Sequence, residues 1–579
     1  MTKTRITSLF TALLLVMTAS AQVLFDGKKP AIDTLTGTWL ITVPKAYFGT
    51  NHTAVVTLDE SVTRCYIDGA RVTSNYTFHN IQPNMTYHVQ VISSTSMVEA
   101  NIQFTHWPVV QIYGSFVKRP YAWGTVVYTH PDSTQQQTIN SRVRWAGSST
   151  ADAGREKHNF HLKFYNPDGS KKDMSFFGLR HDFHWRLDAG QIDFSRVRNR
   201  VAKDIWAQFA SLPHYASIEP KTPYSYVRGD FVEVFLNDEY MGIYSLNEHM
   251  DRQQLKLKKY DYTNKVFHGG LWKPMKWSYI TTFYSLADFD ANKKNWDEFY
   301  MKYPNIDDVK PTNYQTLYDA LYFTQHSSDK VFMDSARYYF DIPVFRDFYL
   351  FTILLQAPDN VGKNVYYACY DAATDKRLTL AIWDLDCTQG QFWSNVGNNY
   401  HNAKVGPEVD FRTEQLSAHK VYKRLWTLDP SFHGLATERY WELRSTTFNP
   451  DSIVARYKAY FDEMKSCGAD QREITRWNRC YDLGGRELNF DNELVYLRNW
   501  WNIHIAYLDS NVFIPYQDGD VNFDHEVNID DVSALIDYLL YNETNINEYR
   551  ADYDRDGKIN IDDITSLIDV LLSKNNASL

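Results

Sequence analysis

Four side chains that could do chemistry follow the apolar segment FYLFTILL: Asp359, Asn364, Asp384 and Asp386. Carboxylate and amide oxygens are the ligands that Mg²⁺ and Ca²⁺ prefer, and a carboxylate can also accept the proton of an attacking hydroxyl. The same residue types also cap turns by bonding to nearby backbone N–H groups. The spacing therefore has two interpretations, a cation site or a set of turn-capping residues.

The elements predicted around these residues would hold them together. Apolar residues recur at helical spacing over 343–356, and Pro358 ends this predicted helix. Two short strands are predicted over 365–370 and 378–383, joined by the turn DAATDK. The second strand leads directly into Asp384, so a helix, a polar loop and a hairpin would converge on the four side chains.

A helix, then D-x-x-x-x-N, a hairpin and a further Asp is the order found in protein kinases. There the first Asp orients the attacking hydroxyl, and the Asn and the later Asp hold the metal ions on the nucleotide phosphates. The segment from Asp359 to Asn364 fits this spacing. However, the chain has no G-x-G-x-x-G loop, no His-Arg-Asp and no Asp-Phe-Gly, which excludes an ordinary protein kinase.

The chain resembles the CotH family of atypical secreted kinases, first known from spore coats. The resemblance runs through much of 142–390, and three segments carry it most clearly: VRWAGSSTADAGREKHNFHLKF (143–164), DFVEVFLNDEYMGIYSLNEHMDR (230–252) and NVYYACYD with LAIWDLDCTQG (364–371 and 380–390). The family's R-G-N-S-S stretch is altered here to Arg144-Trp145-Ala146-Gly147-Ser148-Ser149. The turn of the second segment would lie at Asn237-Asp238.

The resemblance implies a protein kinase site that binds ATP with Mg²⁺ or Mn²⁺. Asp359 would be the catalytic residue, and the metal ligands would be Asn364, Asp384 and Asp386. Lys157 would contact the nucleotide phosphates, with Glu248 as its partner. The acceptor would be a protein hydroxyl.

The last sixty residues contain a repeat with a period of 32. GDVNFDHEVNIDDVSALIDYLL (519–540) matches ADYDRDGKINIDDITSLIDVLL (551–572), and each copy has oxygen ligands at the spacing of an EF-hand-like calcium loop. The predicted ligands are Asp520, Asn522, Asp524, Glu526, Asn528 and Asp531 in the first copy, and Asp552, Asp554, Asp556, Lys558, Asn560 and Asp563 in the second. Glu526 and Lys558 would each contribute a backbone carbonyl.

Each loop runs into a predicted amphipathic helix, and together they resemble the type I dockerin. That module binds two Ca²⁺ ions and docks to a cohesin on a scaffold protein. His525 stands where the second copy has Gly557, and a positive φ is costly for a residue other than glycine. We therefore expect the first loop to bind calcium more weakly.

The acidity of the chain lies in this tail. From Pro515 onward there are fifteen acidic and four basic residues, whereas the whole chain has a net charge of −10. The rest of the chain is therefore close to neutral, which argues against nucleic-acid binding and for a cation site in the tail.

The start of the chain has the order of a cleavable signal peptide: Lys3 and Arg5, an apolar run over 9–17, and Ala19-Ser20-Ala21. This predicts a secreted protein, at the cell surface or outside the cell. No other segment approaches eighteen uninterrupted apolar residues, so no membrane span is expected.

The predicted fold class is multidomain α+β. We expect a signal peptide over 1–21, a β-sandwich accessory domain over 22–105, a CotH kinase-like domain over 106–512 and a dockerin over 515–579. There are five cysteines and no C-x-x-C, which argues against structural zinc. By their separation, Cys467 and Cys480 are the expected disulfide pair.

Three functions remain open. The first is an exported kinase docked by its dockerin onto a cohesin-bearing, polysaccharide-degrading assembly. The second is an inactive CotH-like module that binds within the same assembly. The third is a glycoside hydrolase, for which no acid and nucleophile can be singled out. The presence of Asp359, Asn364 and Asp384 together favours the first.

Overall fold

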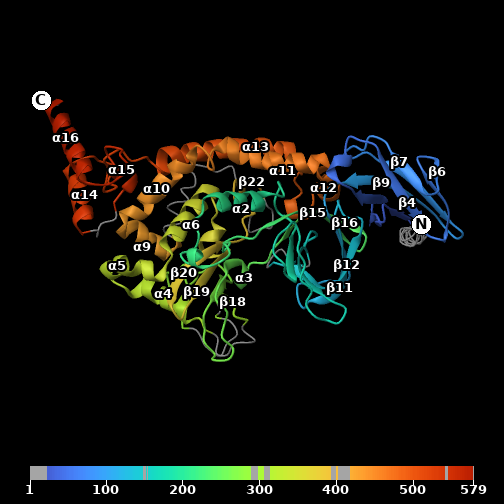
Figure 1. Ribbon diagram of the computed structural model, residues 1–579, viewed down its shortest axis with the longest axis horizontal. Helices are drawn as coiled ribbons and strands as arrows, with labels where there is room; N and C mark the ends of the chain where they lie inside the picture. The colour runs from blue at the N-terminus through green and yellow to red at the C-terminus, as the bar shows by residue number, and fades with distance from the viewer. Residues whose placement is uncertain are drawn as a thin grey trace.

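The computed structural model describes residues 23–147, 151–152, 154–288, 296, 298–305, 313–392, 400–401, 418–541 and 546–577. The predicted signal peptide lies outside the described residues. The fold is mixed α+β, and the molecule is elongated, with the N-terminal strands at one end and the last two long helices at the other (Figure 1).

The N-terminal strands form two sheets around one apolar cluster. The larger sheet has the order β2 (Ala31–Asp33), β3 (Thr38–Thr42), β9 (Met97–Thr105), β8 (Tyr87–Ser93), β5 (Val62–Ile67) and β6 (Ala70–Val72). The smaller sheet has the order β1 (Val23–Phe25), β4 (His52–Leu58) and β7 (Asn75–Phe78). Buried residues alternate with exposed ones along β9, as expected for strands with one face on a core. Both sheets contribute side chains such as Trp39 and Phe78 to this cluster.

A closed barrel follows. Its strands, in order around the barrel, are β10 (Val109–Tyr113), β11 (Ala122–Thr129), β12 (Gln136–Ala146), β13 (Asn159–Tyr165), β14 (His184–Asp188), β16 (Glu239–Asn247) and β15 (Gly229–Leu236). The parallel pairing of β10 with β15 closes it. Asn237 and Asp238 form the predicted turn between β15 and β16, and both have a positive φ, as a tight two-residue hairpin turn requires.

A second sheet lies beside the barrel, with the order β18 (Phe299–Tyr303), β17 (Gly270–Pro274), β19 (Val365–Asp371) and β20 (Asp375–Ile382). The helices of this region are α3 (Arg252–Leu255), α4 (Gln315–His326), α5 (Asp329–Tyr339), α6 (Ile342–Leu355) and α7 (Asp359–Gly362). The helix predicted over 343–356 is α6, and the predicted hairpin is β19–β20, whose second strand begins three residues earlier than expected.

Further helices pack along one side of the barrel and the second sheet (Figure 1). These are α2 (Arg198–Phe209), α9 (Lys420–Leu428), α10 (Pro430–Arg444), α11 (Pro450–Ser466), α12 (Ala469–Trp477) and α13 (Phe490–Tyr507). A short ribbon pairs β21 (Gln391–Phe392) with β22 (Tyr400–His401). One apolar cluster extends from the barrel through α6 to α13, so the barrel, sheet and helices share a core.

The C-terminal unit contains α14 (Ile529–Tyr541), α15 (Glu548–Ala551) and α16 (Ile561–Ala577). Its small core includes Val521, Leu535 and Leu567, which come from both copies of the repeat. Each long helix begins within the last three positions of a predicted calcium loop, so the final predicted ligand, Asp531 or Asp563, lies on the first turn of the helix.

All five cysteines are free thiols. The expected Cys467–Cys480 disulfide is therefore not formed; instead, the Cys467 thiol points back into its own helix end and donates to the Met464 carbonyl at 3.5 Å. No helix in the described part of the chain is both long and apolar enough to cross a lipid bilayer.

Candidate functional site

The loop after α6 brings Asp359 and Asn364 together. Gln356 ends the helix in a left-handed conformation, and α7 then carries Asp359 on its first turn. The Asn364 side-chain amide donates to Asp359 Oδ2 at 2.8 Å, and Lys363 Nζ lies 3.5 Å from the same oxygen. Two of the predicted site residues are thus in direct contact.

The end of β20 is tied to this loop. The Asn360 side chain donates to the Asn364 carbonyl at 3.0 Å and to the Trp383 carbonyl at 2.8 Å. This places Asp384, the residue after Trp383, next to the Asp359 loop. Asn364 and Asp384 both have a positive φ, of 52° and 58°. Such a conformation is uncommon for residues other than glycine, although Asn and Asp adopt it more readily than most, and strained residues of this kind cluster at functional sites.

A further carboxylate, Asp188, joins the group from β14. The Asn199 side chain donates to Asp188 Oδ2 at 2.8 Å and accepts from the Leu385 N–H at 3.1 Å, so it links Asp188 to the loop of Asp384 and Asp386. Asp188 and Asp384 line one small cavity together with Arg186 and Lys203. Sequence reasoning missed Asp188, although the alternation His184, Arg186, Asp188 along one strand face was there to be read.

The carboxylates repel one another. Burial, reinforced by Asp384 and Asp188, raises the pKa of Asp386 well above its ordinary value. Burial also raises the pKa of Asp359; the charge of Lys363 opposes this effect, and that of Asp384 adds to it. A divalent cation would relieve this repulsion, so the donor chemistry fits Mg²⁺ or Mn²⁺.

These carboxylates lie side by side but do not converge on one point. Within the described residues, three metal-ligating side chains meet at only two places, the histidines 161, 184 and 249 and the aspartates 552, 554 and 563. Mg²⁺ in nucleotide sites takes only one or two protein carboxylates and completes its shell with phosphate oxygens and water. An open pair of acidic loops is therefore compatible with a metal ion whose remaining ligands come from phosphate and water.

A cationic strand face lies opposite the acidic loops. Phe160, Leu162, Trp185 and Leu187 of β13 and β14 are buried in the barrel core, so the intervening residues face the other way. On that face His161 pairs with Arg186, and Lys163 pairs with His184.

Arg186 reaches from this face to the acidic loops. Its guanidinium lies 4.8 Å from the ring of Trp383, directly before Asp384. Lys273 of β17 approaches the same ring, at 5.3 Å. Burial and the charges of Lys302 and Arg186 lower the pKa of Lys273 to about 7, against the opposing effect of Asp384. The positive charges of Arg186 and Lys273 would attract an anion to this end of the acidic loops.

The structure does not place Lys157 as the sequence suggested. Lys157 Nζ is buried, donating to Glu473 Oε1 of α12 at 2.7 Å and to the Ile243 carbonyl at 2.9 Å. Burial lowers the pKa of Lys157 to about 8, although Glu473 opposes this effect. Lys157 precedes β13 by two residues and so lies outside the strand alternation that leaves Lys163 half-buried rather than fully buried.

Glu248 is not the partner of Lys157 either. Its carboxylate binds the Arg228 guanidinium through two contacts, at 2.7 and 3.0 Å, and accepts from Gln254 at 2.9 Å. The expected Lys157–Glu248 pair is thus replaced by two separate pairs, Lys157–Glu473 and Arg228–Glu248. Both pairs bury a charged side chain against a compensating charge.

The two calcium loops have matching geometry. Asp563 Oδ1 accepts from the N–H groups of Tyr553 and Asp554, and Asp531 makes the equivalent contacts in the first loop. His525 and Gly557 share a left-handed conformation, with φ of 67° and 85°. In the second loop the carboxylates of Asp552, Asp554 and Asp563 converge within 4.8 Å.

The first loop holds an unpartnered carboxylate. Asp520 is fully buried, and neither of its oxygens has a hydrogen-bond partner among the described residues. Burial and the nearby Asp531 and Asp524 raise the pKa of Asp520 to about 6. A buried carboxylate without partners is costly unless a cation binds it, so the residues present fit calcium. The remaining predicted ligands, Asn522, Glu526, Asn528, Asp556, Lys558 and Asn560, lie in the same two loops.

Comparisons with known protein families match two parts of the chain. Residues 143–508 match the family model described as CotH kinase protein. The chain belongs to this family. Residues 518–572 match the dockerin type I domain, which implies calcium binding and docking to a cohesin. A search of curated proteins finds no match to the chain.

Proposed function

We propose that this CotH-family chain is a secreted protein kinase that transfers the γ-phosphate of ATP to a protein hydroxyl. The observation that carries the proposal is the Asp359–Asn364 contact, held beside Asp384 and opposite the cationic face of β13 and β14. Acidic and cationic groups facing one another in this way suit a nucleotide held through its metal and its phosphates.

Each group has a role in the proposed transfer. Asp359 accepts the proton of the attacking hydroxyl group while the hydroxyl oxygen forms a bond to the γ-phosphorus of ATP. The bond between the γ-phosphorus and the β–γ bridging oxygen breaks, and ADP is released. Asn364, Asp384 and Asp386, together with Asp188, would hold Mg²⁺ or Mn²⁺, and the ion would neutralise charge on the phosphates. Lys163, rather than Lys157, contacts the nucleotide phosphates.

The remaining organisation supports a docked, exported enzyme. We propose a β-sandwich accessory domain over 22–105, a kinase-like domain over 106–512 and a dockerin over 515–579, with 1–21 as a cleaved signal. The dockerin would attach the kinase to a cohesin-bearing assembly that degrades polysaccharides. Apolar side chains exposed on its helices, such as Ile529, Leu540 and Ile561, are available for that contact.

An inactive binding module is the second candidate, and one observation favours it. The lysine that matches the family motif most directly, Lys157, is enclosed by Glu473 and cannot reach a phosphate without breaking that pair. The two candidates differ in turnover rather than in fold.

Labelling by γ-³²P-ATP separates them. We expect the intact chain, with Mg²⁺ or Mn²⁺, to incorporate phosphate into itself or into casein added as a generic acceptor. Asp359→Asn and Asp384→Asn should reduce labelling by at least 100-fold, whereas Asp334→Asn, an exposed carboxylate on α5, should not. Absence of labelling in the intact chain, or equal labelling in all variants, would contradict the kinase proposal.

A further inference from the structure

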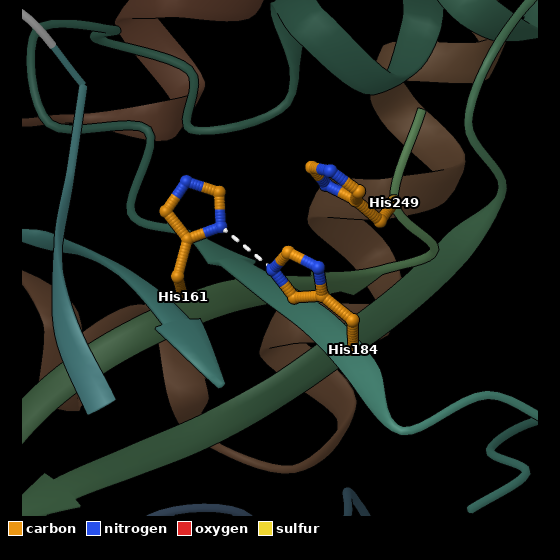
Figure 2. A group of neighbouring side chains, drawn as sticks. All are labelled: His161, His184 and His249. Carbon is orange, nitrogen blue, oxygen red and sulfur yellow. Dashed lines mark hydrogen bonds between the residues drawn. The ribbon is translucent and has the colours of Figure 1, made fainter. Parts of the chain in front are cut away.

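Three histidines converge on the cationic face of the barrel. His161 lies on β13, His184 on β14, and His249 two residues beyond the end of β16. Arg186 pairs with Asn247 between β14 and β16, and continuing this register by two residues places His249 opposite His184. The three imidazoles lie side by side in Figure 2, although the residues are far apart in the sequence.

The distances suit a metal ion. His161 Nδ1 lies 3.2 Å from His184 Nε2, and one ligand nitrogen from each of the three histidines falls within 4.8 Å of the others. Two nitrogens bound at about 2.0–2.1 Å to a tetrahedral zinc ion are separated by about 3.3 Å. The existing contact therefore already has the spacing of two ligands on one ion.

The ring nitrogens are available to a metal. The close contact between His161 and His184 requires one ring to carry a proton that the other accepts, and a metal ion can replace that proton. His249 Nδ1 is buried and has no hydrogen-bond partner in the part of the chain that the structure describes. The His249 ring stacks on that of His184, with centroids 4.0 Å apart.

The surroundings keep the imidazoles neutral. Burial, together with His184 and Arg186, lowers the pKa of His161 well below its ordinary value, and burial does the same to His184 and His249. Protons therefore do not compete for the ligand nitrogens at neutral pH. The neighbouring positive charges repel a bound metal ion, whereas the negative charge of Asp251 near His184 attracts it.

We propose that His161, His184 and His249 bind one transition-metal ion of the Zn²⁺ class. Neutral imidazoles favour Zn²⁺, Co²⁺, Ni²⁺ and Cu²⁺ over Mg²⁺ and Ca²⁺, which prefer the oxygen ligands of the acidic loops and the dockerin. Three protein ligands leave a fourth position open, and Lys163, Arg186 and Arg144 nearby favour an anion or hydroxide there. This site shares Lys163 and Arg186 with the proposed nucleotide site, but the three histidines have no role in the proposed phosphotransfer.

The test is Co²⁺ titration of the intact chain, prepared without a histidine tag and saturated with Ca²⁺ to fill the dockerin loops. We expect visible absorption bands of a tetrahedral cobalt site that saturate at one ion per chain and disappear on addition of one equivalent of Zn²⁺. His184→Gln and His249→Gln should weaken Co²⁺ binding by at least tenfold, whereas His181→Gln, an exposed histidine in the same segment, should not.

A measurement on the unaltered chain guards against misfolded variants. X-ray absorption at the zinc edge of the one-equivalent complex is expected to show three imidazole nitrogens at about 2.0–2.1 Å. Binding without saturation at one ion, equal affinity in all three variants, or a zinc shell made of oxygen alone would each overturn the proposal.

Discussion

At the scale of single residues, two lysines in one segment have opposite fates. Lys157 is buried against Glu473, whereas Lys163 stands on the cationic face of β13 opposite His184. A motif match cannot distinguish them, because the choice depends on where the strand begins and which residues its alternation exposes. β13 begins at Asn159, two residues after Lys157. Sequence patterns do not locate the end of a strand to within two residues, so they cannot show which of the two lysines is buried.

This difference gives a direct prediction. Lys157→Met should lower the free energy of unfolding by about 3–5 kcal/mol, because among the described residues it leaves the buried Glu473 with Arg196 as its one remaining ion-pair partner. Lys163→Met should leave stability nearly unchanged and weaken ATP binding by at least tenfold. Urea unfolding and calorimetric titration measure the two effects. A stable Lys157→Met variant that loses ATP binding would instead assign the phosphate contact to Lys157.

Among the structural elements, those that depend on local sequence patterns are predicted correctly, whereas the pairing of strands distant in sequence is not predicted. Helix α6 and the hairpin β19–β20 follow from apolar periodicity and from Pro358, so the neighbourhood of Asp359, Asn364 and Asp384 was predictable. Asp188 and the three histidines depend on the pairing of β14 with β13 and β16. These registers join residues from 21 (Lys163 and His184) to 61 (Arg186 and Asn247) positions apart, and no local pattern specifies them.

The calcium loops are the elements that the sequence predicts most fully, because each loop is local. Asp520→Asn and Asp552→Asn should each lower the calcium stoichiometry of the intact chain from two to one, since position 1 of the loop is lost. Asp520→Asn should leave the calcium-free fold intact, because neither carboxylate oxygen makes a hydrogen bond that the change would remove.

Isothermal titration with Ca²⁺ measures these stoichiometries. Asp569→Asn, on the exposed side of α16, is the matched control for loss of one negative charge in the tail, and it should keep both ions. Two bound ions in both loop variants, or none in the unaltered chain, would contradict the assignment of the loops.

At the scale of the whole molecule, the catalytic candidate lies between two end units. On one side Lys45 pairs with Glu463 of α11, and on the other Arg550 pairs with Glu438 of α10 at 2.9 Å. The first calcium loop packs closely on α10: a Cβ added at Gly434 would lie 2.1 Å from the Phe523 ring. The dockerin is therefore held against the helices, a contact that composition and motif spacing could not predict.

The central claim is that the acidic loops and the cationic strand face form one nucleotide site. Calorimetric titration of the intact chain with ATP, in Mg²⁺ and again in excess EDTA, tests it most directly. The account predicts one ATP per chain in Mg²⁺, with affinity at least tenfold weaker in EDTA, in Asp384→Asn and in Lys163→Met, but not in Asp334→Asn. No binding heat in Mg²⁺, or an affinity that none of these changes alters, would contradict it.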